Sequence, residues 1–368
     1  MIKTAILLLA IQFTAAATLL SEPYSVDPEL IDTVETEGYK RIWGSPEGAF
    51  FLLKKSGAEI RQYPGSDIRN ISVKGTQKLI SSERGNYYAL ISYSNFLPTQ
   101  LQVTAVSVYD RSGELLWTKE GPGCNAFIMC DSAPLLVGIE GAEGFPESRL
   151  VFFNSSGETV GNAKVQNFYN GQFCENGEFF FGISGAGSLL KFTNTGKLVY
   201  DFGHAIRYHS SFDGKLVAVV ADSVTTIHSD VNTVVTWPVS QRSLREIRFS
   251  RDNAYVAALY GDRLNVFDIT ANSIVAEHTL DDPAFRFFRF DADPNFNYFV
   301  CGASNSADSP ESRNTKGRVM LLGAGGNLLW GEEVVYEEWS VKYPDVRLDS
   351  SRRVLSLLTP STLQVFKF

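Results

Sequence analysis

The sequence repeats a two-part pattern at intervals near 40 residues, and this repeat constrains the fold more than any other feature. The first part is a short polar turn followed by a continuous apolar run. The apolar runs are at 49–53, 87–91, 135–137, 179–181, 216–220, 255–259, 298–300 and 354–358. Short continuous apolar runs between turn signals are typical of strands that are buried on both faces.

The second part is an apolar strand that ends in a tight turn rich in Asn, Asp and Gly. These turns are centred on positions 57, 113, 157, 196, 232, 271 and 326. No segment between them shows a helical pattern. A repeat of about 40 residues that alternates strands with turns predicts a radial arrangement of β-sheets. We therefore predict an all-β fold, a single β-propeller with four-stranded blades.

The number and closure of the blades follow from the same count. A sheet that is apolar on both faces cannot bury itself, and packing such sheets around an axis buries them and leaves short edges. Eight copies predict eight blades, and seven is the alternative because the first copy has an atypical turn. The final strand, 363–368, is the third of its unit. We expect a segment near 30–37 to pair with it and close the propeller.

One stretch of the chain resembles a known family. Residues 108–117 read Val-Tyr-Asp-Arg-Ser-Gly-Glu-Leu-Leu-Trp, which resembles the repeat of quinoprotein-type β-propellers. In that family the Trp four residues after the Gly docks between blades, a position held here by Trp117, Trp330 and Tyr200. Residues 249–268 resemble a WD40-type repeat. The resemblance covers nearly all of residues 39–368 and implies the fold more than a function.

The N-terminus has the layout of a secretory signal peptide. Lys3 is the sole charge in the first 21 residues, an apolar run spans 6–11, and Ala15 to Ala17 supply small residues for cleavage. We predict that residues 1–17 are removed, that 18–38 contain the closing strand and that 39–368 form the propeller. An uncleaved anchor is the alternative. We expect a periplasmic or extracellular chain without a stable membrane span in its mature form.

The charge balance restricts the partners. The chain has 33 Lys and Arg against 41 Asp and Glu, a net charge of −8. Nucleic acid binding needs a basic face that neutralises phosphates, so DNA and RNA are not expected partners. We expect a monomer that binds a protein or a peptide.

Four residues form the main candidate site. Aligning the first strand of the last four units places His209, Arg248, Arg289 and Arg347 at one equivalent position. Cationic groups at one level of consecutive blades are a candidate site for an anion or an acidic partner segment. The interpretation that we favour is that each cation pairs with a carboxylate, such as Glu246 or Asp345, and joins neighbouring blades.

Three long connections, 94–101, 141–148 and 302–317, form the second candidate site. Long loops on a rigid scaffold commonly carry function. We interpret four apolar residues in these loops as exposed anchors for a partner: Phe96, Leu97, Phe145 and Pro146. Simple insertions are the alternative.

The chain has four cysteines, and two of them share a register. Cys130 and Cys174 occupy equivalent positions in neighbouring units, which suggests a disulfide if their Cα atoms lie within about 7 Å. We favour buried free thiols over this bridge. Asp291 to Asn297 places oxygen ligands at alternate positions, like the start of a calcium loop. It lacks the usual Gly and the final acidic residue, so we predict a plain turn, with no metal or cofactor.

Motifs for catalysis are missing. The sequence has no Gly-x-Ser-x-Gly elbow and no phosphate-binding glycine loop. An acidic cluster lies between Trp330 and Trp339, and we interpret it as a solvated edge: Glu332, Glu333, Glu337 and Glu338. The hypothesis is an exported, non-enzymatic scaffold. The alternative is a propeller enzyme, either a quinone-dependent dehydrogenase or a hydrolase or lyase of extracellular polymers.

Overall fold

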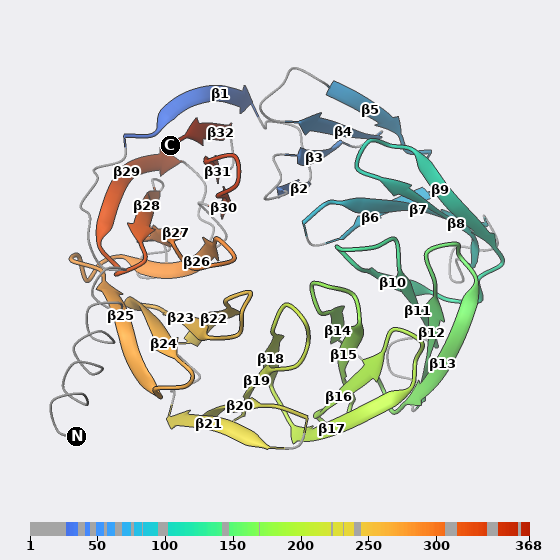
Figure 1. Ribbon diagram of the computed structural model, residues 1–368. Helices are drawn as coiled ribbons and strands as arrows, with labels where there is room; N and C mark the ends of the chain where they lie inside the picture. Colours follow the sequence, from blue (N-terminus) through green and yellow to red (C-terminus); the bar gives the residue numbers. More distant parts are fainter. Residues whose placement is uncertain are drawn as a thin grey trace, which may run out of the picture. The chain divides into compact units, whose positions relative to one another are not determined.

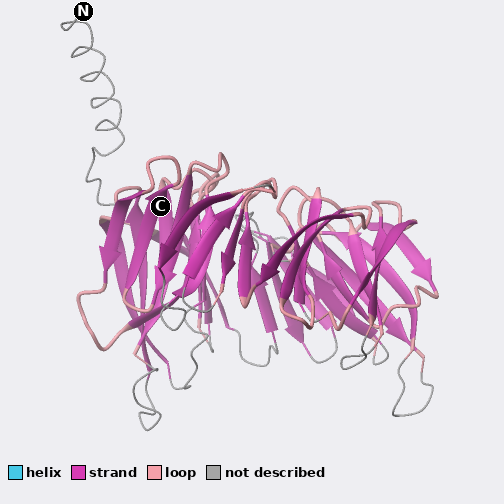
Figure 2. Ribbon diagram, turned by 90° about the horizontal axis from the view of Figure 1, so that it is seen from below, coloured by secondary structure: helices cyan, strands magenta, loops and turns pink. Residues whose placement is uncertain are grey.

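The computed structural model describes residues 27–35, 41–44, 49–54, 57–62, 68–74, 77–82, 84–94, 102–141, 147–168, 170–221, 224–230, 232–238, 244–305, 315–336, 345–359 and 362–368. Within these ranges the regular elements are β-strands (Figure 2). None of the described segments is a helix long and apolar enough to cross a bilayer. The predicted all-β class is therefore confirmed.

The chain divides into two compact units. Unit 1 comprises Met1–Glu35 and Tyr255–Phe368, and unit 2 comprises Thr36–Ala254. The strands form four-stranded sheets, each of them a run of hydrogen-bonded neighbours. Within the described ranges, seven sheets use four consecutive strands, and an eighth combines β1 with the last three strands.

The strands of unit 2, grouped by sheet, are β2 (Arg41–Gly44), β3 (Ala49–Lys54), β4 (Gly57–Gln62) and β5 (Ile68–Ser72); β6 (Gln77–Ser81), β7 (Tyr87–Tyr93), β8 (Val103–Asp110) and β9 (Leu115–Glu120); β10 (Ala126–Met129), β11 (Leu136–Glu140), β12 (Ser148–Phe153) and β13 (Thr159–Val165); β14 (Asn170–Phe173), β15 (Phe179–Ile183), β16 (Ser188–Thr193) and β17 (Leu198–His204); β18 (Arg207–Ser210), β19 (Val217–Val220), β20 (Val224–His228) and β21 (Thr233–Pro238); and β22 (Leu244–Phe249).

The strands of unit 1 are the partners of β22, namely β23 (Tyr255–Tyr260), β24 (Arg263–Asp268) and β25 (Ser273–Thr279); then β26 (Arg286–Ala292), β27 (Tyr298–Ser304), β28 (Thr315–Gly323) and β29 (Leu328–Tyr336); and β30 (Asp345–Asp349), β31 (Val354–Leu358) and β32 (Thr362–Lys367) with β1 (Glu29–Glu35).

The two ends of the chain share the last sheet. β1 is antiparallel to β32, from the pair Glu29 with Lys367 to the pair Glu35 with Thr362, and its register shifts between Leu30 and Asp32. Figure 1 shows β1 beside β32. The predicted pairing of the N-terminal and C-terminal segments is confirmed.

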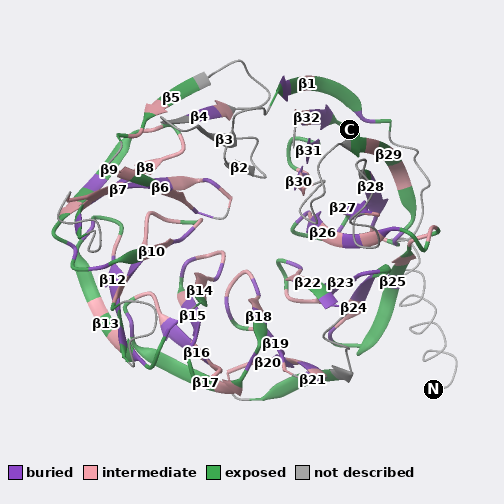
Figure 3. Ribbon diagram, turned by 180° about the vertical axis from the view of Figure 1, so that it is seen from behind, coloured by how far each residue is buried: buried purple, intermediate pink, exposed green. Residues whose placement is uncertain are grey.

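Burial varies across each sheet in a regular way. The described side chains of second strands such as β19 and β31 are all buried. Fourth strands such as β13 and β17 are largely exposed (Figure 3). The continuous apolar runs of the sequence are therefore the second strands, whose two faces both pack inside the protein. Phe180 and Phe181, adjacent on β15, are both fully buried.

The docking Trp predicted from the sequence packs as expected at position 117. Trp117 on β9 is buried, and its indole nitrogen donates a hydrogen bond to the carbonyl of Pro134 in the next sheet (3.2 Å). Gly157, in the β12–β13 turn of that sheet, has φ +80°, and a Cβ there would lie 2.7 Å from the Trp117 ring. The turn needs glycine both for its backbone conformation and for this close approach.

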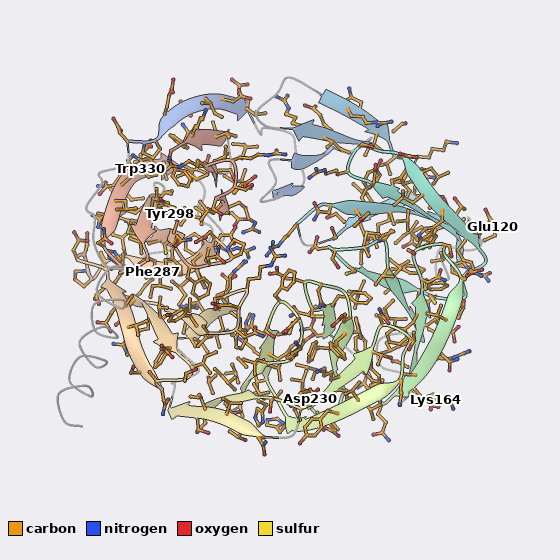
Figure 4. The ribbon with its side chains drawn as sticks, viewed as in Figure 1. Glu120, Lys164, Asp230, Phe287, Tyr298 and Trp330 are labelled. Carbon is orange, nitrogen blue, oxygen red and sulfur yellow. The ribbon has the colours of Figure 1, made fainter. Side chains whose placement is uncertain are left out.

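A different contact replaces the Trp in the following sheet. Gly161 stands where the docking Trp would be, and a Cβ on it would overlap the carbonyl oxygen of Thr195 in the next turn. In unit 1 the ring centres of Trp330 and Phe366 are 5.4 Å apart, and Figure 4 labels Trp330. Fourth strands therefore join neighbouring sheets by more than one type of packing.

Candidate functional site

The first strand of each sheet differs from the strand that follows it. On β18, Arg207 is exposed and His209 is half-buried, while their partners on β19, Val220 and Ala218, are fully buried. A first strand is hydrogen-bonded to one neighbour only. First strands carry buried side chains such as Tyr208 and Ile247 beside exposed or half-buried polar ones, and the candidate cations belong to the second group.

A repeated turn fixes the register of these strands. The Ser211 hydroxyl donates to Asp213 (2.9 Å) and the Ser250 hydroxyl donates to Asp252 (2.6 Å), each at the turn that follows a first strand. His209 lies two residues before Ser211, and Arg248 lies two residues before Ser250. These two residues are therefore at equivalent positions, as the sequence alignment predicted.

In unit 1 the register corrects one assignment. His209 pairs with Ala218 and Arg347 with Ser356, so nine residues separate the partners in both hairpins. Arg289 instead pairs with Gly302, thirteen residues away, and Asp291 holds the equivalent position opposite Val300. The predicted position of Arg289 was wrong, because the turn of this hairpin begins at Asp293, which lies two residues after Asp291 and four after Arg289.

The two arginines of unit 1 share one carboxylate. Arg289 Nε on β26 lies 3.1 Å from Asp345 Oδ1 on β30, and Arg347 Nη1 lies 3.0 Å from the same oxygen. Asp291, itself buried, accepts a hydrogen bond from the backbone N–H of Leu348 (2.9 Å). These contacts match the favoured interpretation, in which the cations join neighbouring sheets.

The first strands of unit 2 repeat the pairing within one strand but make a different contact between strands. Arg248 contacts Glu246 on its own strand, with Nη2 and Nε 3.0 and 3.2 Å from Oε1. Arg207 Nη1 donates to the backbone carbonyl of Leu244 (3.2 Å) and so connects β18 with β22. Arg245, directly after Leu244, is exposed. Arg207 and Arg245 were missed by the sequence analysis, although both lie on the strands of His209 and Arg248.

The cysteines have a structural explanation. Cys130 and Cys174 start the repeated turn where Ser211 and Ser250 start it elsewhere, and the Cys174 sulfur accepts a hydrogen bond from the N–H of Phe179 (3.2 Å). All four cysteines are free and buried, so the Cys130–Cys174 disulfide is not formed. Burial raises the pKa of Cys174 to about 11, which keeps it a neutral thiol.

The aspartates of the suspected calcium loop are used by the turn itself. Asp293 Oδ1 accepts the N–H of Tyr298 (2.8 Å), and its Oδ2 accepts the side-chain amide of Asn297 (3.1 Å). Among the described residues, no group of three His, Cys, Asp or Glu could hold a metal ion.

A similar turn in unit 2 joins two sheets. Asn253 Nδ2 donates to Asp213 Oδ1 (3.0 Å). Burial acts to raise the pKa of Asp213, but hydrogen bonds from Asn253 and from its own turn outweigh burial and lower that pKa to about 2. The carboxylate is therefore charged at neutral pH and holds neighbouring turns together.

Several predicted positions lie outside the described residues. These are the signal peptide 1–17, the loop residues Phe96, Leu97, Phe145 and Pro146, and Glu337 and Glu338 of the acidic cluster. In the rest of that cluster, Glu333 forms an ion pair with Arg318 (3.0 Å), and burial raises the pKa of Glu332.

Solved structures resemble this arrangement. The C-terminal WD40 domain of Sif2 aligns with a TM-score of 0.62 at 11% sequence identity, over 94% of this chain and 99% of that domain. The fold is a WD40-like β-propeller. A eukaryotic initiation factor aligns with a TM-score of 0.54 at 12% identity, over 86% of this chain and 92% of that one. No protein-family model matches the sequence, and a search of curated proteins found no match.

Proposed function

We propose that this propeller is an exported, non-enzymatic scaffold that binds a protein or peptide partner. In this proposal the eight sheets are eight blades, and the pairing of β1 with β32 closes them. Residues 1–17 are a signal peptide that is removed on export, and residues 39–368 form the propeller. The charge distribution in the first residues supports the export step.

The observation that carries the binding function is the polar character of the first strands. The first strand of each propeller blade lines the central channel. Side chains such as Arg207 and His209 on β18 are exposed or half-buried there and lie outside the apolar contacts between sheets. WD40-like propellers are typically protein-binding scaffolds. In this proposal the first strands are the surface where the chain presents charged groups to a partner.

The long loops are a second part of the proposed binding face. Phe96 and Leu97 in one loop, and Phe145 and Pro146 in another, are the apolar residues that would anchor a partner there. They would add apolar contact area to the polar contacts of the first strands, as in many protein interfaces.

Affinity capture tests the binding function. The mature chain, residues 18–368, is immobilised and exposed to the exported proteins of its own source, with a heat-unfolded sample as control. We expect a protein that is retained saturably and is displaced by free propeller. Retention equal to that on the unfolded control would contradict the proposal, and so would turnover of a quinone dye or of an extracellular polymer by the purified chain.

The export step has its own test. N-terminal sequencing of the chain recovered from the exported fraction is expected to begin at Thr18. A chain that retains Met1, or that stays with the non-exported proteins, would contradict this part of the proposal.

A further inference from the structure

The first strands of unit 2 from β6 to β22 have an excess of positive charge. They carry Lys78, Arg207, Arg245 and Arg248, against the single carboxylate of Glu246. The whole chain has a net charge of −8. A cluster of positive side chains in a chain of net negative charge creates a local positive potential that attracts anionic groups.

The excess is concentrated on two neighbouring strands. Arg207 reaches from β18 to the carbonyl of Leu244 on β22, which brings its guanidinium beside the backbone that leads into Arg245. Both arginines are exposed, so their side chains can meet a partner without disturbing the apolar core.

The partners of the nearby cations differ. Glu246 holds Arg248 through two hydrogen bonds. Within the described part of the chain, the contact of Arg207 is a backbone carbonyl, and no carboxylate contacts Arg245. An exposed guanidinium offers several N–H groups in one plane, and a carboxylate accepts two of them at once.

We propose that Arg207 and Arg245 bind carboxylates of an acidic peptide segment that lies across β18 and β22. This inference rests on the proposed scaffold function and assigns the chemistry of its partner. An acidic segment of a protein fits better than a nucleic acid, because two arginines can pair with a few carboxylates, whereas a nucleic acid needs a broad basic face that neutralises many phosphates. Asp or Glu side chains placed a few residues apart would reach both arginines.

Binding of a labelled glutamate-rich peptide tests the inference. Fluorescence anisotropy is measured with the mature chain, with R207Q/R245Q and with the control K164Q/K197Q. The control removes the same two positive charges from β13 and from the turn before β17, and Figure 4 labels Lys164 on β13. We expect R207Q/R245Q to bind at least about tenfold more weakly, since charge-assisted contacts of this kind are worth about one factor of ten or more. The control is expected to bind like the wild type.

Competition experiments and a charge-reversed variant identify the chemistry of the ligand. Inorganic phosphate and free glutamate at matched charge concentration are expected to compete far less well than the peptide, and R207E/R245E is expected to prefer a lysine-rich peptide. Equal binding by wild type and R207Q/R245Q would overturn the inference, as would full displacement by phosphate. If R207Q/R245Q captures the natural partner as well as the wild type does, this inference is overturned and the scaffold function stands. If the wild type captures no partner at all, the scaffold function is overturned.

Discussion

The first strands of the two units carry the same kind of side chain in different surroundings. In unit 1, Arg289 crosses from β26 to Asp345 on β30, and Arg347 on β30 contacts the same carboxylate. In unit 2, Arg207 crosses to a backbone carbonyl and Arg245 remains exposed. A cation on a first strand therefore does not mark a binding site by itself. What differs is the group that the crossing cation meets on the neighbouring strand, which is a carboxylate for Arg289 and a backbone carbonyl for Arg207.

The largest effect is expected where a charge is fully enclosed. Lys191 on β16 is 0% exposed; its Nζ lies 2.6 Å from Asp230 Oδ1 and 3.9 Å from the centre of the Phe179 ring. Asp230→Ala would leave that ammonium group buried without its partner. We expect the free energy of unfolding to fall by about 3 kcal/mol, because an unpaired buried charge is costly.

Chemical denaturation of Asp230→Ala and Lys191→Met measures this effect. Lys191→Met removes the buried charge and leaves Asp230, which is partly exposed, to be hydrated. We expect its cost to stay below about 1.5 kcal/mol. Equal losses for the two variants would show that the pair acts through packing and not through charge.

A smaller loss is expected from the shared carboxylate of unit 1. Asp345→Ala removes the group between Arg289 and Arg347, but all three side chains are partly exposed and water can replace the lost contacts. We expect a loss of about 1 kcal/mol in the free energy of unfolding. No measurable loss in denaturant titration would remove the distinction between the two units.

The hydrogen bond between Asn253 and Asp213 predicts a dependence on pH. The pKa of Asp213 in the folded state, about 2, lies below its value in the unfolded chain. Its stabilising contribution is therefore present above pH about 4 and is lost as the pH falls toward 2. The difference in melting temperature between wild type and Asn253→Ala should shrink between pH 5 and pH 3. A constant difference across this range would argue against the charged hydrogen bond.

The smallest effect on stability is expected at the proposed site. R207Q/R245Q replaces two exposed side chains, so its free energy of unfolding should stay within about 0.5 kcal/mol of the wild type. Thermal unfolding followed by circular dichroism measures this, with K164Q/K197Q as the matched control. A loss comparable to that of Asp345→Ala would mean that Arg207 also joins the sheets, as the unit 1 arginines do.

Much of the fold follows directly from the repeat. Apolar runs such as 179–181 become second strands buried on both faces, and the turn at Gly157 receives Trp117 from the preceding sheet. These features are local in sequence or recur at a fixed spacing. Periodicity and turn chemistry predict the strands and turns, and the resemblance to quinoprotein-type propellers implies the docking of Trp117.

The candidate site was predicted less completely because its contacts join different sheets. Nothing local to Arg207 indicates that it reaches Leu244, and only the hairpin register shows that Asp291 takes the position given to Arg289. Lys191 is a similar case, since a lysine in an apolar strand is ordinarily expected at the surface. Its burial depends on Asp230 in the next sheet.

Hydrogen exchange with and without the glutamate-rich peptide tests the distinction between the two units most directly. We expect the peptide to slow exchange of backbone amides in 207–210 and 244–249 and to leave 286–292 and 345–349 unchanged. Protection confined to the first strands of unit 1, or absent from both units, would contradict the assignment of Arg207 and Arg245 as the groups that receive an acidic partner.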